Sequence, residues 1–205
     1  MNKVISNLKY IKIRDVLSVF LFVIALPIAC IIKVTNHIRH KELWLICEAE
    51  NTARDNGYHL YKYIKEKHPE NKCYYAINKK SSDYKKIKKY GNIIQFYSLK
   101  HWIVYLAADK NISTQKAGNP NAPLFYILQV YGILKNKRVF LQHGVIKDDL
   151  PYVHYENAKF RLFICGAKDE YEYIKKEFGY PEEYVKYTGL ARFDNLYENN
   201  MGYIE

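Results

Sequence analysis

The fold of this chain is best introduced by one stretch, VFLQHGVIKD at residues 139–148, in which a short apolar run ends in a cluster of polar side chains. The apolar run is typical of a buried strand, and the strand pattern stops at Gln142. In an open α/β sheet, ligands bind just beyond the carboxyl ends of the strands. The stretch therefore predicts a strand whose end presents an imidazole, a glycine and a lysine where chemistry is expected.

Further short apolar runs lie on both sides of this stretch, and segments with helical spacing separate most of them. The predicted strands cover residues 43–47, 73–77, 92–96, 110–113, 138–142, 161–166 and 184–188. The predicted helices cover residues 55–67, 99–107, 122–134 and 168–178, together with a lysine-rich helix that ends at Tyr90. Short strands that alternate with helices are typical of a parallel sheet with helices on both faces. The sequence thus predicts a Rossmann-like α/β domain over residues 41–205.

An uncharged apolar segment, residues 16–32, precedes this domain and has basic residues on both flanks. Its length lies at the lower limit, about 17 residues, for a helix that crosses a bilayer. A signal peptide is disfavoured, because cleavage would export a lysine-rich chain with free cysteines. An interfacial helix, a single span and a buried helix of a soluble protein stay open. We expect residues 1–40 to form a membrane-anchoring or interfacial helix with basic flanks.

The charge of the chain is unevenly distributed. The net charge is +11, and residues 60–90 hold ten lysines against three acidic residues. Such a surface attracts phosphorylated substrates, membrane headgroups or nucleic acid, although lysines on an amphipathic helix can also be a plain solvated face. No recognised nucleic-acid-binding motif accompanies the lysines, so nucleic acid is not an expected partner.

Cofactor and metal signals are missing from the sequence. The loop after the first predicted strand reads Glu48-Ala49-Glu50-Asn51, where a dinucleotide-binding protein would have a glycine-rich fingerprint. A Walker lysine loop and metal-ligand spacings are also missing. The four cysteines are scattered, which suits reduced thiols in the cytoplasm rather than disulfides or a metal site. We therefore expect neither a cofactor nor a metal.

His143 is the candidate catalytic residue. A neutral imidazole at a strand end can take the proton of a hydroxyl group while the oxygen attacks an electrophile. Gly144 leaves room for a bulky substrate and permits unusual backbone angles, and Lys147 can neutralise a phosphate. Asp148 or Asp149 could orient the imidazole. The alternative is that His143 is an ordinary structural histidine beside a glycine.

Several segments make the chain resemble the amino-terminal half of the CDP-glycerol:poly(glycerophosphate) glycerophosphotransferase family, the teichoic-acid-type polymerases and primases. These segments are residues 44–46, 54–58, 74–77, 79–84, 140–148, 163–167 and 187–194. Their most specific elements are Gln-His-Gly at 142–144 and Thr-Gly-x-x-Arg-x-Asp at 188–194. Without the resemblance, Arg192 and Asp194 of the second element could be an ordinary surface ion pair.

The resemblance implies a membrane-associated transferase of GT-B-like fold in which this chain is the acceptor-side half. Such enzymes move glycerol phosphate from CDP-glycerol to the hydroxyl of a lipid-linked acceptor at the cytoplasmic membrane face, and they release CMP. The donor could also be another CDP-alditol, such as CDP-ribitol. By this resemblance His143 is the catalytic base. Gly144, Lys147, Arg192 and Asp194 are expected to bind substrate.

The second, nucleotide-binding domain of the family has no counterpart within residues 1–205. Two expectations follow: a transferase in teichoic-acid or capsule-type polymer synthesis, or a catalytically incomplete membrane-binding module or partner subunit of such a transferase. A nucleic-acid-binding protein is a third alternative, and the lysine excess alone supports it.

Overall fold

The structure is a computed structural model that describes residues 13–115, 118–130, 132 and 137–194. One seven-stranded sheet forms its centre, with the strand order β3-β2-β1-β4-β5-β6-β7 and parallel pairing throughout. The strands are β1 (Leu43–Cys47), β2 (Lys72–Ile77), β3 (Ile93–Gln95), β4 (Lys110–Ser113), β5 (Lys137–Phe140), β6 (Leu162–Cys165) and β7 (Val185–Tyr187). The predicted parallel sheet is confirmed, and each predicted strand has its counterpart.

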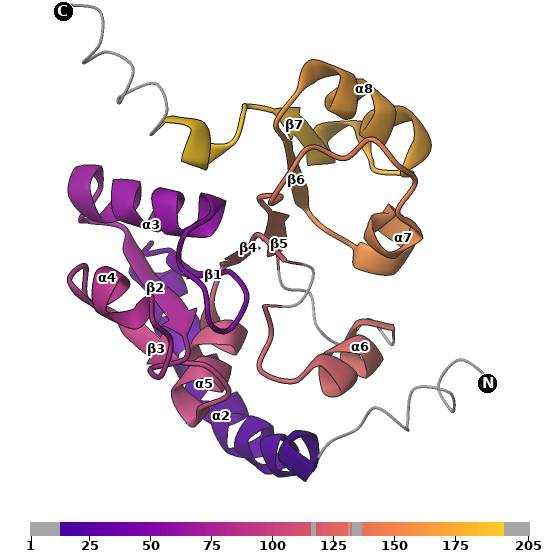
Figure 1. The fold of residues 1–205 in the computed structure, drawn as a ribbon. Coiled ribbons are helices and arrows are strands. Elements are labelled where there is room, and N and C mark those ends of the chain that lie inside the picture. Colours follow the sequence, from indigo (N-terminus) through magenta and orange to yellow (C-terminus); the bar gives the residue numbers. More distant parts are fainter. Residues whose placement is uncertain (1–12, 116–117, 131, 133–136, 195–205) are drawn as a thin grey trace, which may run out of the picture.

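Helices connect the strands, as Figure 1 shows. The α-helices are α2 (Ile13–Ile38), α3 (Asn56–Lys67), α4 (Tyr84–Lys88), α5 (Leu99–Ala107), α6 (Ala122–Val130), α7 (Tyr155–Ala158) and α8 (Lys168–Glu177). Short 3-10 helices are η2 (Pro151–Val153), η3 (Glu182–Tyr184) and η4 (Ala191–Phe193). The predicted helix 122–134 begins as expected, since the side chain of Asn121 accepts a hydrogen bond from the Leu124 amide. Its predicted end lies largely outside the described residues.

The two faces of the sheet carry different helices because side chains alternate along each strand. Leu43 and Leu45 of β1 pack on one face in a cluster that includes buried residues of α2 and α5. Ile46 of the same strand packs on the other face, with residues of α3 and with Ile87 of α4. The predicted arrangement of helices on both faces is therefore confirmed.

A third apolar cluster supports the second half of the sheet. Phe140, Phe160 and Phe163 lie in it together with Ile174 of α8. The rings of Phe140 and Phe160 stack at 4.7 Å between centroids. Burial of one such phenylalanine contributes about 1.5–3 kcal/mol, so this cluster fixes the end of β5 relative to β6 and α8.

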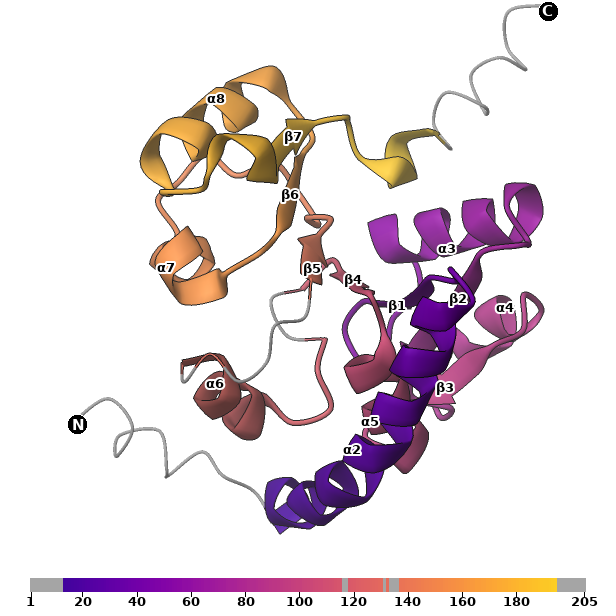
Figure 2. The same ribbon diagram turned by 180° about the vertical axis from the view of Figure 1, so that it is seen from behind.

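The apolar helix α2 extends beyond the predicted segment and lies beside α5, as both views show (Figures 1 and 2). Ala25 and Ala29 are buried where the two helices meet. The Trp102 indole of α5 donates a hydrogen bond of 2.9 Å to Ser18 Oγ. One side of α2 is thus packed on the domain, and large apolar side chains cover the other side.

Candidate functional site

The carboxyl ends of the parallel strands place several loops at one edge of the sheet. A cavity of about 540 Å³ lies there, lined mainly by the segment 142–153 and by Gln115. His143, Gly144 and Lys147 all line this cavity, and His143 is exposed rather than packed in the core. The structure therefore brings together three of the five predicted site residues in one loop.

The imidazole of His143 has a defined orientation. Its Nδ1 atom lies 3.1 Å from the backbone carbonyl oxygen of Thr114, in the loop after β4. A carbonyl oxygen can only accept a hydrogen bond, so Nδ1 carries the hydrogen and Nε2 of the neutral ring keeps its lone pair. The Thr114 carbonyl, rather than a carboxylate of Asp148 or Asp149, is thus the partner that orients the ring at Nδ1. Asp149 pairs instead with His154.

The backbone conformation of this loop differs from the expectation at Gly144. The residue with a left-handed backbone is Gln142, whose φ is 63°, and Gly144 does not have a positive φ. Because Gln142 leaves the strand conformation, β5 ends at Phe140 rather than at the predicted residue 142. A Cβ atom at Gly144 would meet nothing within 4 Å. The feature that Gly144 offers is therefore open space beside His143.

A buried carboxylate, Glu170, holds the loop from the side of α8. It is 2% exposed. Its Oε1 atom accepts hydrogen bonds from Gln142 Nε2 at 2.9 Å and from the Ile146 amide at 2.7 Å. Its Oε2 atom accepts one from the Gly166 amide at 2.6 Å. Sequence reasoning missed this residue, because an acidic residue in the first turn of a helix is common for electrostatic reasons alone.

Asn56, at the start of α3, holds the same loop from the opposite side. Its side-chain amide donates to the carbonyl groups of Gln142 at 2.8 Å and Leu141 at 3.3 Å. Its Oδ1 atom accepts a hydrogen bond from the Arg192 amide at 3.0 Å. Asn56 therefore joins the loops after β1, β5 and β7.

The two remaining predicted residues lie in the loop after β7, outside the residues that line the cavity. Arg192 pairs with Asp55 at 3.1 Å. Asp194 is exposed and acts electrostatically on His59 of α3. Arg192 and Asp194 thus belong to the same edge of the sheet as His143, and Asn56 makes the connection. Arg192 and Asp55 are 137 positions apart in the chain, so local sequence patterns could not predict that they pair.

Another buried acid, Glu48, fills the position where the fingerprint loop of a dinucleotide-binding protein would lie. Its Oε1 atom accepts from the amides of Asp55 and Tyr58, and its Oε2 atom accepts from that of Arg54. Those amides lie in the first turn of α3 and in the two residues before it, a position where they would otherwise be available to a phosphate. Gly57 permits this approach, since a Cβ there would lie 2.9 Å from Glu48 Cγ.

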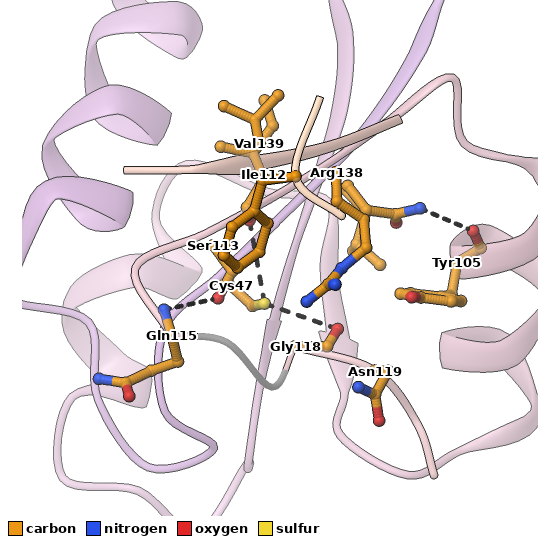
Figure 3. A pocket seen from close by; sticks show the side chains of 12 residues that line it. Cys47, Tyr105, Ile112, Ser113, Gln115, Gly118, Asn119, Arg138 and Val139 are labelled. Carbon is orange, nitrogen blue, oxygen red and sulfur yellow. Dashed lines mark hydrogen bonds between the residues drawn. The ribbon is translucent and has the colours of Figure 1, made fainter. Parts of the chain in front are cut away.

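A second, smaller cavity lies beneath the loop after β4 and measures about 10 Å³, the space of one water molecule. Figure 3 shows Arg138 and Cys47 among the residues that line it. Arg138 donates to the Ala158 carbonyl and lies over the rings of Phe125 and Phe160. Burial raises the pKa of the Cys47 thiol to about 12, which suppresses the reactive thiolate. This cavity is too small for a substrate.

The described part of the chain contains no cluster of three histidine, cysteine or acidic residues that could hold a metal ion. All four cysteines are free thiols: Cys30 is exposed, and Cys47, Cys73 and Cys165 are buried.

Comparisons with known proteins agree with the resemblance drawn from the motifs. Residues 28–204 match the family described as CDP-Glycerol:Poly(glycerophosphate) glycerophosphotransferase. The chain is 33% identical over 183 residues to the minor teichoic acid biosynthesis protein GgaB of Bacillus subtilis (strain 168), covering 84% of this chain and 20% of GgaB.

Solved structures of the wall teichoic acid polymerase TagF have the same fold. One variant superposes with a TM-score of 0.58 at 13% identity and covers 94% of this chain and 51% of that chain. A variant soaked with CDPG gives 0.54 at 12% identity, with 82% and 48% covered. The chain thus spans about half of the solved TagF chains and a fifth of GgaB.

Proposed function

The chain belongs to the CDP-glycerol:poly(glycerophosphate) glycerophosphotransferase family, and from that premise we propose that it forms the acceptor side of a membrane-associated transferase in teichoic-acid or capsule-type polymer synthesis. The proposed reaction transfers glycerol phosphate from CDP-glycerol to the hydroxyl group of a lipid-linked acceptor and releases CMP. The observation that carries the proposal is the position of His143, which lines the large cavity while Thr114 holds its Nδ1 atom.

The chemistry follows from that tautomer. Nε2 of the neutral ring accepts the proton of the acceptor hydroxyl, and the oxygen attacks the phosphorus of the glycerol phosphate group. The bond between this phosphorus and the CMP oxygen breaks, so CMP leaves with its electron pair. Lys147 is exposed in the cavity lining and can neutralise phosphate charge, while the open space at Gly144 admits the acceptor.

Arg192 and Asp194 are proposed to contact substrate from the neighbouring loop. The Arg192 side chain is partly exposed beyond its pairing with Asp55, and its planar group suits a phosphate. The donor is CDP-glycerol or another CDP-alditol. A TagF variant soaked with CDPG supports the first of these.

We propose that α2 attaches the protein to the cytoplasmic face of the membrane. The segment Asp15–Ile38 is long and apolar enough to cross a bilayer by length and composition. One side of α2 contacts α5: Ser18 accepts a hydrogen bond from Trp102, and the Phe22 ring packs on the same indole. These contacts favour an interfacial position, because a spanning helix would draw Trp102 and its neighbours into the lipid. The exposed large apolar residues of α2 are Ile13, Val16, Leu17, Val19, Phe20, Val23, Ile24, Leu26, Ile28, Ile31, Val34 and Ile38.

The lysine-rich helices α3 and α4 pack on the opposite face of the sheet from α2. With α2 on the membrane, their lysines would face away from the lipid. They therefore suit a soluble anionic ligand or plain solvation better than headgroups, and the basic residues near the end of α2 are better placed for headgroup contact.

A second candidate function is a partner subunit or incomplete module of such a transferase. The chain spans about half of the solved TagF chain and a fifth of GgaB, so the assay compares the chain with and without a polypeptide that carries the second half. The two candidates differ in whether the chain turns over CDP-glycerol without another polypeptide.

The test uses the full chain with radiolabelled CDP-glycerol and acceptor-bearing membranes, and it measures release of CMP. A transferase releases CMP in an acceptor-dependent manner, and His143→Ala abolishes the release. The control His68→Ala, at a partly exposed position at the end of α3, preserves it. No release by the wild-type chain, restored by adding a polypeptide that carries the second half, supports the partner subunit. Release that His143→Ala leaves intact contradicts the assignment of the base.

A further inference from the structure

We propose that Glu170 is a positioning residue that, together with Asn56, sets the direction of the His143 imidazole. The proposal rests on the proposed function only in taking His143 as the base. Glu170 does not line the large cavity and is 2% exposed. It therefore acts through the loop and not on the substrate.

The loop requires such external contacts because its backbone is unfavourable by itself. Gln142 has a φ of 63°, in the left-handed region that residues with a Cβ atom rarely adopt. His143 follows at once, and its side chain is exposed, with Thr114 as its hydrogen-bond partner among the described residues. The direction of the ring is therefore set mainly by the backbone on which it stands.

Two buried side chains hold that backbone from opposite sides. Asn56 donates to the carbonyl groups of Leu141 and Gln142, immediately before His143. Glu170 accepts from the side chain of Gln142 and from the amide of Ile146, so it holds the loop on both sides of His143. The segment between these contacts is short, which leaves the imidazole little freedom to turn away from Thr114.

The chemistry of residue 170 matters beyond its size. Three donors converge on the two oxygen atoms of the carboxylate: Gln142 Nε2 and the amides of Ile146 and Gly166. A glutamine has the same shape, but its amide group would place a donor against at least one of these donors. In a buried position a mismatched donor is costly, because water cannot replace the lost partner. Whichever way the amide turns, Glu170→Gln also removes the negative charge that strengthens the remaining bonds. It is therefore an isosteric change that weakens the attachment of the loop to α8.

The experiment measures the tautomer of His143 by nitrogen NMR of the full chain labelled at histidine, in detergent micelles. The His143 signals are identified by their loss in His143→Ala. In the wild type Nδ1 carries the hydrogen, because Thr114 accepts it. Glu170→Gln shifts the population toward the tautomer of free imidazole, with the hydrogen on Nε2. The matched control Glu172→Gln, at an exposed position of the same helix, leaves the wild-type tautomer.

A second variant keeps the test decisive if Glu170→Gln does not fold. Gln142→Ala removes one donor and leaves Glu170 bonded to the amides of Ile146 and Gly166, and it shifts the tautomer partway. A wild-type tautomer in every folded variant of Glu170 and Gln142 overturns the positioning role. The NMR result and the proposed function can fail independently. CMP release that persists in His143→Ala would show that His143 is not the catalytic base, but it would not change the tautomer measured by NMR.

Discussion

Replacement of Asn56 by alanine should destabilise the fold by about 2–4 kcal/mol, because it removes a buried group that joins three loops. The side chain is 1% exposed and takes part in three hydrogen bonds, with the carbonyls of Leu141 and Gln142 and with the amide of Arg192. A hydrogen bond contributes about 0.5–1.5 kcal/mol net, and a buried group left without a partner costs about 1–3 kcal/mol. The hydrogen bond to Leu141 is long, and Arg192 is partly accessible to water, so these two bonds contribute less than the maximum. The summed loss for the three hydrogen bonds is therefore about 2–4 kcal/mol.

Urea unfolding of the full chain in micelles, followed by fluorescence, gives the free energy of unfolding. The matched control is Asn157→Ala. Its side-chain amide also donates two hydrogen bonds, to the Pro151 carbonyl and to Glu156, but it lies at the surface. We expect a loss below about 1 kcal/mol for the control, because water replaces the lost partners. Equal losses for the two variants would refute the reasoning that Asn56 joins the loops.

Three further predictions concern other parts of the structure. Burial lowers the pKa of His101 from its ordinary 6.5 to about 3. Between these two pKa values the unfolded chain therefore binds a proton at His101 that the folded chain does not bind. The free energy of unfolding should fall by up to about 1.4 kcal/mol per pH unit as the pH drops through this interval. Acid unfolding of His101→Phe should lack this pH-dependent loss. Gly166→Ala should lower the melting temperature by several degrees, since the added Cβ would lie 2.7 Å from Leu190 Cγ; an unchanged melting temperature would show that Leu190 moves freely. Phe20→Glu should weaken sedimentation with anionic vesicles, whereas replacing the exposed lysines of α4 by glutamine should not; the reverse result would place the lysine face on the membrane.

The elements of the fold were predictable because burial on both faces of a parallel strand leaves a continuous apolar run in the sequence. The position of His143 was predictable for the same reason, since a strand end identifies the edge of the sheet where loops collect. The extent of α2 was not predictable from hydropathy. Asp15 and Asn36 are buried in this helix although they are polar, and an average over apolar residues does not detect such packing.

The partners of the site residues could not be predicted, because they come from distant loops. Thr114 and Asn56 lie beside the loop of His143 because β1 pairs with β4 and β4 pairs with β5. From the sequence, Gly144 is the residue that permits an unusual backbone angle, since glycine is the usual residue at such angles; the structure has the positive φ at Gln142. The contacts of Asn56 explain the difference, because two carbonyl groups are held by a side chain that sequence spacing does not connect to them.

The central claim is that Nε2 of His143 takes the proton of the acceptor hydroxyl. Its most direct test is the turnover number for CDP-glycerol-dependent CMP release, compared between wild type and His143→Ala in an assembly that is active with the wild-type chain. Loss of a general base predicts a fall of about 10²–10⁴-fold. A turnover number within about threefold of the wild type would contradict the claim.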